Sequence, residues 1–268
     1  MSEEQSYLFT ADGSAELLTT DLPNYPYVTG MKSLVGFACK EEVWDLLEAT
    51  EKEVMKEKVK NGLAKIVDSP EGKLIRFPLI QYRMAHYHPD LGNFVCMTPP
   101  GKGAVPAVCC KTLIDKPAKP KLGAIIIKYN LDSDGDPLMG KNGRIAYELY
   151  QLIFDQRLYN DILSQKKYHT LLKSDMTLVC ENADYKTLKG TFAGESIWQK
   201  DPETAKEIVQ RTSGHWTRIV SKLGKPMTEE KFRQTLALSS NISSKQAVPD
   251  MSKDVEQELA GLLSTADV

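Results

Sequence analysis

The 268-residue chain combines 41% hydrophobic with 26% charged residues, a balance typical of a folded domain with a sizeable core. A net charge of −2 argues against a protein that coats nucleic acid with its whole surface, as a histone does. No apolar run reaches the roughly 20 residues that cross a bilayer, and the acidic, polar start is unlike a signal peptide. Five cysteines without framework spacing favour reduced thiols, so we expect a cytoplasmic protein, in the host cytoplasm if it is viral.

The first 71 residues are predicted to form an irregular segment followed by a helix. Prolines at 23 and 26 favour a loop or an edge strand, because proline fixes φ and donates no hydrogen bond. Between residues 40 and 66 the apolar side chains recur on roughly one stripe, which predicts a helix. A turn at residues 68–72 ends it.

Strands are predicted from residue 72 onward. The run 73–83 is rich in β-formers, and Pro78 within it indicates a bulge or an edge. Shorter strands are expected at 94–97 and 105–113. The isoleucine run inside 122–129 is typical of a strand buried on both faces.

Helical patterns dominate the second half of the chain. Apolar spacing predicts a helix over 144–165 and alternation predicts a hairpin over 175–192. The helix predicted at 202–223 begins at Asp201, a suitable N-cap, and Pro202. A shorter helix over 228–238 precedes a serine-rich linker and an amphipathic segment whose charge from Asp250 onward is 1 − 5 = −4.

This order of elements predicts an α+β protein whose core is a β-barrel of the oligonucleotide-binding type. We expect four parts: an N-terminal segment at 1–71, the barrel core at 72–195, helices packed on the core at 196–238, and a flexible linker with an acidic tail at 239–268. The tail is a docking element for other proteins, an autoinhibitory polyanion that competes with DNA for a basic groove, or a frayed terminus without a role.

Charge is distributed unevenly along the chain. Residues 72–130 hold nine basic and two acidic side chains, 9 − 2 = +7, so the remainder sums to −9. Five aromatic residues lie among these cations, and single-stranded nucleic acids bind to such surfaces because phosphates attract cations and unstacked bases stack on rings. The alternative is a solvated basic face that binds other anions or nothing.

A metal site is not predicted. Residues His86, His88, Cys96, Cys109 and Cys110 lie close together in the sequence, but no pair has the spacing of a zinc knuckle. If 105–113 is a strand, Cys109 and Cys110 point to opposite faces. The acidic run that starts at Asp132 fails as a calcium loop, because an EF-hand needs glycine at its sixth and glutamate at its twelfth position.

No motif of an enzyme is found. The sequence lacks a nucleophile elbow, a metalloprotease helix, a dinucleotide fingerprint and a phosphate-binding P-loop. Glycine-flanked cations at 101–103 and 140–144 either close on a backbone phosphate or form ordinary loop tips. We therefore predict no catalytic residue and no cofactor.

The order of elements resembles the single-stranded DNA-binding, helix-destabilising proteins of large tailed phages. Three segments carry the likeness: the strand that contains Arg76-Phe77-Pro78, the run from Leu122 through the acidic loop to Ser164, and the hairpin at 175–192 with the acidic C-terminus. The resemblance implies partners among replication and recombination proteins, recruited through the tail. The family's basic N-terminal arm is missing, and the ligand spacing of its zinc module is not matched at 96–110.

The prediction is therefore sequence-tolerant binding of single-stranded nucleic acid, with DNA favoured over RNA, in phage replication or recombination. The alternative is a viral structural or assembly protein that self-associates and does not bind nucleic acid. The predicted contacts with nucleic acid are Lys73, Arg76, Tyr82, Arg83, Tyr87, Phe94, Lys102, Lys111, Lys119, Lys121, Lys128 and Tyr129.

Overall fold

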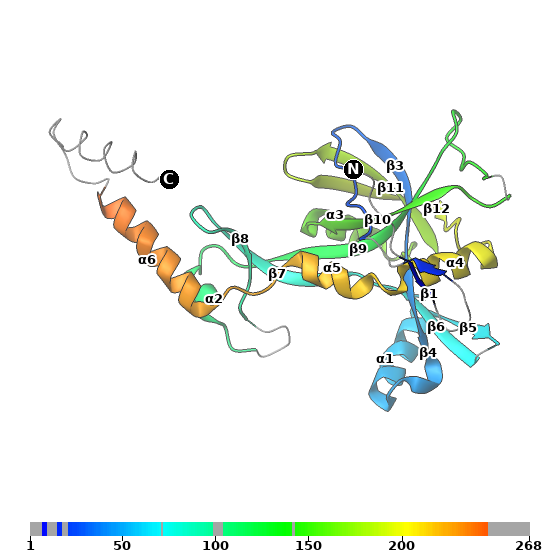
Figure 1. Ribbon diagram of the computed structural model, residues 1–268, viewed down its shortest axis with the longest axis horizontal. Helices are drawn as coiled ribbons and strands as arrows, with labels where there is room; N and C mark the ends of the chain where they lie inside the picture. Colours follow the sequence, from blue (N-terminus) through cyan, green and yellow to red (C-terminus); the bar gives the residue numbers. More distant parts are fainter. Residues whose placement is uncertain are drawn as a thin grey trace. The chain divides into compact units, whose positions relative to one another are not determined.

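The computed structural model describes residues 7–9, 15–17, 21–70, 72–98, 104–140 and 143–245 (Figure 1). The chain divides into two compact units. Unit 1 contains residues up to Ala85 and from Lys119 to Lys225, and unit 2 contains His86–Ala118 and the chain from Pro226 onward. The predicted boundaries at 71 and 195 do not match this division, because unit 2 is assembled from an insertion and a C-terminal segment.

Unit 1 is built around strand β9, Lys119–Tyr129, which lies in a mostly antiparallel sheet. Along one edge β9 pairs with β10, Tyr147–Phe154. Its other edge is shared by β3, Lys32–Phe37, at residues 126–128 and by β7, Gln81–His88, at residues 119–123. Beyond β3 lie β11, Ser174–Asn182, and β12, Thr187–Glu195, so the predicted hairpin at 175–192 is confirmed.

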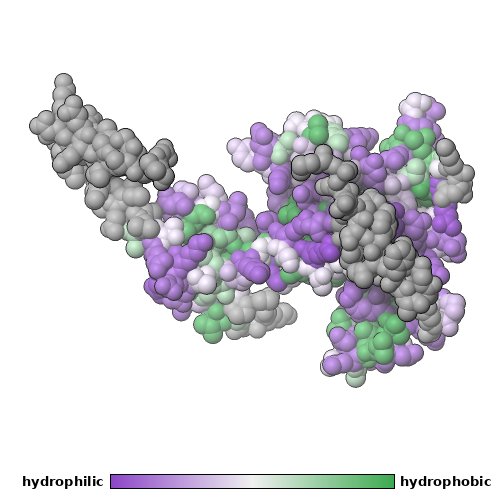
Figure 2. Space-filling view, in the orientation of Figure 1, coloured by the Kyte–Doolittle hydropathy of each residue, from purple (hydrophilic) through white to green (hydrophobic). Residues whose placement is uncertain are grey.

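A small lobe of unit 1 contains a second, three-stranded sheet. Its strand order is β4, Cys39–Val43, then β6, Gly72–Pro78, then β5, Lys65–Ser69. Helix α1, Ala49–Lys60, follows the short 3-10 helix η1, Trp44–Leu46. The lobe has its own core around Ile75 and Phe77. Figure 2 shows hydrophobic surface over this lobe, where Leu46 and Val54 are exposed.

The α+β prediction is confirmed, but the described strands do not form a closed barrel. Helix α3, Gln156–Gln165, packs on the outer strand β12. Its Asp161 and Gln165 side chains accept hydrogen bonds from the backbone N–H groups of Gly190 and Phe192, at 3.0 and 3.1 Å. Gln165 also donates to the carbonyl of Gly190. Helical side chains thus satisfy the edge strand in place of a further strand.

Helices α4, Pro202–Ser213, and α5, Trp216–Leu223, cover the opposite face of the sheet. Asp201 caps α4 as predicted, because its side chain accepts from the N–H of Glu203. Helix α5 lies on β9 at Gly123, where an added Cβ would come within 2.6 Å of Ile219. Glycine is therefore needed there for the helix to approach the strand.

Two predicted helices were wrong over part of their length. In residues 40–66 only 49–60 are α-helical, and β4 and β5 flank them. In residues 144–165 the first part is strand β10, which pairs with β9 along its whole length. The packing that makes β10 a strand involves residues far away in the sequence. The spacing of apolar residues alone cannot distinguish such a buried strand from a helix.

Asp175, at the start of β11, is a carboxylate in the core of unit 1 and is 1% exposed. It accepts a hydrogen bond from the N–H of Ile197 at 2.8 Å. An added Cβ on Gly36 would lie 2.9 Å from its Oδ1 atom and 2.7 Å from Trp198, so glycine is required opposite. Burial raises the pKa of Asp175 to about 6 and outweighs its hydrogen bonds.

We expect Asp175→Asn to change how stability depends on pH. The pKa of Asp175 in the folded protein lies above the unfolded value of 3.8. The contribution of Asp175 to the free energy of unfolding is therefore fully present below pH 3.8 and is lost as the pH rises to about 6. That loss is on the order of 3 kcal/mol. Relative to wild type, the Asn variant should therefore gain about this much between pH 4 and pH 7 in urea unfolding followed by tryptophan fluorescence. A variant-minus-wild-type difference independent of pH would contradict the assignment.

Unit 2 contains the end of β7, strand β8, Gly92–Val95, helix α2, Val108–Thr112, and helix α6, Glu229–Lys245. Val95 forms a bridge with Pro226, and α2 packs against α6. The predicted strand at 105–113 was wrong, since this segment contains α2. The acidic tail at 250–268 and the predicted contact residue Lys102 lie outside the described residues. No described helix is long and apolar enough to span a membrane.

Candidate functional site

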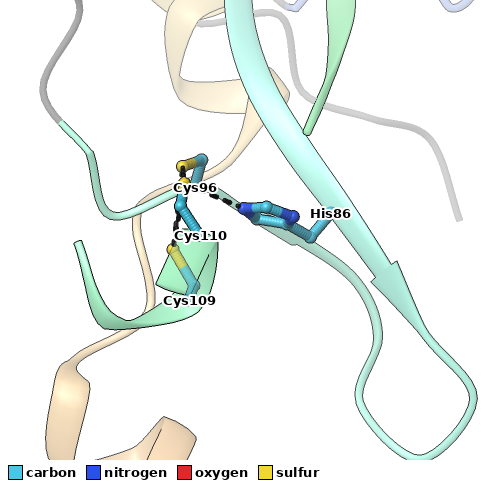
Figure 3. A group of neighbouring side chains, drawn as sticks. All are labelled: His86, Cys96, Cys109 and Cys110. Atoms are coloured by element: carbon cyan, nitrogen blue, oxygen red, sulfur yellow. Dashed lines mark hydrogen bonds between the residues drawn. The ribbon is translucent and has the colours of Figure 1, made fainter. Parts of the chain in front are cut away.

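Four side chains with metal-binding atoms converge in unit 2. His86 comes from β7, Cys96 follows β8, and Cys109 and Cys110 are neighbours in α2 (Figure 3). One ring nitrogen and three sulfurs lie within 4.8 Å of one another. His86, Cys96 and Cys109 are buried, and Cys110 is partly exposed.

The spacing of these atoms fits tetrahedral zinc. With Zn–S bonds of about 2.3 Å and Zn–N bonds of about 2.0 Å, ligand atoms in a tetrahedron lie about 3.5–3.8 Å apart. The Sγ atom of Cys96 lies 3.7 Å from that of Cys109 and 3.3 Å from that of Cys110. The Cys109 and Cys110 sulfurs are 4.0 Å apart, and Cys110 Sγ lies 3.5 Å from His86 Nε2. A Cys3His set of this size is typical of a structural zinc site.

The surroundings of His86 orient it for this role. Its Nδ1 atom lies 3.2 Å from the carbonyl oxygen of Lys116, which fixes that nitrogen as the donor. Its Nε2 atom faces the sulfurs and would be the ligand atom. A carbonyl partner of this kind is the usual companion of a metal-bound histidine.

Hydrogen bonds also reach the sulfurs. The N–H groups of Met97 and Thr98 donate to Cys109 and Cys96, each at 3.4 Å, and the Thr98 hydroxyl lies 3.2 Å from Cys110. Burial would raise the pKa of Cys96, but hydrogen bonds from Thr98 and Cys110 lower it to about 7. Burial raises the pKa of Cys109 to about 11. The Cys96 thiol therefore ionises more readily than the Cys109 thiol.

Aromatic rings pack beside the cluster. Phe94 stacks on His86 with ring centroids 5.5 Å apart, and Phe232 of α6 packs on Phe94 at 5.6 Å. Phe94 is 7% exposed and Phe232 is fully buried. The prediction that Phe94 stacks on bases was therefore wrong, because its ring belongs to the core of unit 2.

The sequence argument against a metal depended on the strand predicted at 105–113. On a strand, Cys109 and Cys110 would diverge, but successive side chains of a helix are separated by about 100° and can turn toward one point. The density of histidine and cysteine between residues 86 and 110 was the signal that could have located this cluster. The knuckle spacing was too narrow a criterion for a site built from three separate segments.

A second feature, the cationic strip of unit 1, consists of Arg83, Lys119 and Lys121. In the β7–β9 pair Arg83 lies directly opposite Lys121. Lys119 is two residues from Lys121 along β9 and therefore lies on the same face. Within the described residues none of the three has an ion-pair partner. Like charges directly opposite each other on neighbouring strands are destabilising.

Other predicted contacts do not reach the surface. Arg76 is 7% exposed and its Nε atom donates to Glu41 at 2.6 Å, so this cation is already neutralised. Tyr129 is 2% exposed and its hydroxyl accepts from the N–H of Trp198. These two predictions were wrong, because the side chains are part of the core of unit 1.

The remaining predicted residues vary in accessibility. Tyr82 and Tyr87 are 51% and 58% exposed, and Tyr82 lies on the face of β7 opposite to Arg83. Lys128 is half-buried, 5.8 Å from the ring of Tyr150. Lys73, Lys111 and Lys119 are exposed.

Sequence reasoning missed a pair of aromatic residues near Lys128. Tyr27 and Tyr150 each pack edge-on against buried Tyr25 and each lies under a lysine, Lys186 and Lys128 respectively. They lie outside the basic stretch, so the charge pattern gave no signal for them.

Comparison of the chain with protein-family models, curated proteins and solved structures found no match. The roles assigned below therefore depend on the geometry of the chain itself.

Proposed function

We propose that the protein binds single-stranded DNA without strong sequence preference and that a structural zinc ion holds unit 2 together. The antiparallel pairing of β3, β7 and β10 with β9 is compatible with a core of the oligonucleotide-binding type. Four protein ligands leave no open position for a substrate, which favours a structural over a catalytic metal.

The observation that carries DNA binding is the opposition of Arg83 and Lys121 beside Lys119. Two cations directly opposite each other on adjacent strands repel each other, and a phosphate bound between them removes this repulsion. The strip is therefore assigned to the phosphate backbone. Such contacts carry no sequence information, which agrees with sequence-tolerant binding.

Stacking is assigned to the exposed rings of Tyr82 and Tyr87. A base stacked on an aromatic side chain contributes about 1–3 kcal/mol to binding. Because Tyr82 projects from the face opposite to the strip, its replacement by leucine reports whether the DNA reaches both faces of β7.

The test is a fluorescence anisotropy titration of the full chain with a labelled thymidine oligonucleotide and with a duplex at two salt concentrations. We expect binding to the single strand that weakens steeply with salt. Absence of binding at low salt, together with self-association, would favour the alternative of an assembly protein. Equal affinity for the duplex would replace the proposal with general polyanion binding.

A further inference from the structure

Two sulfurs of the cluster are closer than the others. The Sγ atoms of Cys96 and Cys110 lie 3.3 Å apart, compared with 3.7 Å for Cys96 and Cys109 and 4.0 Å for Cys109 and Cys110. A disulfide requires about 2.05 Å between sulfurs. The Cys96–Cys110 pair therefore needs the smallest movement to form a covalent bond.

Access to an oxidant also selects Cys110. It is the partly exposed member of the cluster, whereas Cys96 is 4% exposed and Cys109 is fully buried. The susceptibility of a cysteine to peroxide rises with its exposure to solvent. A sulfenic acid formed on Cys110 would then lie beside the Cys96 sulfur, which can act as the resolving thiol.

The two other pairings are less favourable. Cys109 is closed off from solvent, and its sulfur lies further from Cys96. Cys109 and Cys110 are adjacent residues in α2, so a bond between them would distort the helix that presents both sulfurs.

We propose that Cys96 and Cys110 form an oxidation site at which peroxide creates a disulfide and thereby releases the metal. The inference assumes the zinc centre of the proposed function. Losing two sulfur ligands leaves His86 and Cys109, too few to retain zinc in a structural site. Oxidation would thus loosen unit 2, and a dithiol together with zinc would restore it.

The reaction balances with peroxide as the only added reagent. The Cys110 sulfur attacks peroxide, an S–O bond forms, the O–O bond breaks and hydroxide leaves. The Cys96 sulfur then attacks the sulfenic sulfur, so that the S–S bond forms, the S–O bond breaks and a second hydroxide leaves. The two thiolates together lose two electrons, which reduce the peroxide.

The test begins with the zinc content of the full-length protein and then adds hydrogen peroxide in the presence of a chromogenic zinc chelator. We expect release of the bound zinc as the free thiols fall from the five cysteines of the chain to three. Trypsin places Cys96 in peptide 84–102 and both neighbouring cysteines in peptide 103–111, so fragmentation of the linked pair identifies the partner. Dithiothreitol plus zinc should reverse both changes.

Cys39→Ser and Cys180→Ser serve as matched controls, since both cysteines are buried in unit 1 outside the cluster. Each should release zinc at the wild-type rate. Retention of zinc under excess peroxide, a cross-link to Cys109, or sulfinate on Cys110 without a cross-link would overturn the inference and leave the zinc centre intact. An untreated protein without zinc would instead reject the metal centre itself, and the inference with it.

Discussion

Removal of zinc from the full-length protein with a chelator is expected to unfold unit 2 and leave unit 1 folded. Structural zinc sites contribute about 10–16 kcal/mol of apparent binding free energy, which becomes folding free energy where the ligands come from separate segments. Here the metal would join β7, the end of β8 and α2. Hydrogen exchange in residues 86–118 should therefore lose its protection.

The chain provides an internal control for this experiment. Its three tryptophans, Trp44, Trp198 and Trp216, all belong to unit 1, so their fluorescence should not change when the metal is removed. Substitution provides a second control. His86→Ala should weaken zinc binding by about 100-fold or more, whereas His88→Ala, which contacts Asp90 rather than the cluster, should bind zinc like wild type. Unchanged exchange after chelation, or equal effects of the two substitutions, would refute the metal centre.

Arg83→Gln combined with Lys121→Gln is expected to reduce affinity for single-stranded DNA at least about tenfold at low salt. Each lost phosphate contact should also lower the slope of log K against log salt by about 0.7, or about 1.4 for the pair. Because the substitutions remove mutual repulsion between neighbouring strands, thermal stability should stay the same or rise. The affinity loss would then be separable from misfolding.

The matched control is Lys56→Gln with Lys206→Gln, which changes the net charge equally on exposed positions of α1 and α4. This variant should lose less than about threefold in affinity. Equal losses in both double variants would show that binding depends on overall charge rather than on the cationic strip.

Local chemistry was the part of the fold that the sequence could predict. The N-cap at Asp201, the hairpin at 175–192 and the buried run at 122–129 all depend on neighbouring residues, and all three are present. Strand β10 was not predicted, because it is a strand only through its pairing with β9, a contact between distant residues. Apolar residues at helical and strand spacing coincide over such short runs.

For the candidate site, too, the sequence contained some of the information and lacked the rest. The basic stretch includes Arg83, Lys119 and Lys121, which share one face of the β7–β9 pair, but charge and aromaticity say nothing about which face a side chain occupies. Arg76 is not available to bind phosphate, because it forms an ion pair with Glu41, a residue 35 positions earlier in the chain. The cluster of one histidine and three cysteines needed a helix in place of a strand before two adjacent cysteines could turn toward one point.

The outer strand β12 has a consequence for handling the protein. An exposed strand edge is a template on which another chain can add a strand, the first step of many aggregates. Asp161 and Gln165 already occupy the N–H groups of Gly190 and Phe192 and the carbonyl of Gly190. Concentrated samples should therefore resist intermolecular sheet growth at this edge for as long as α3 stays docked.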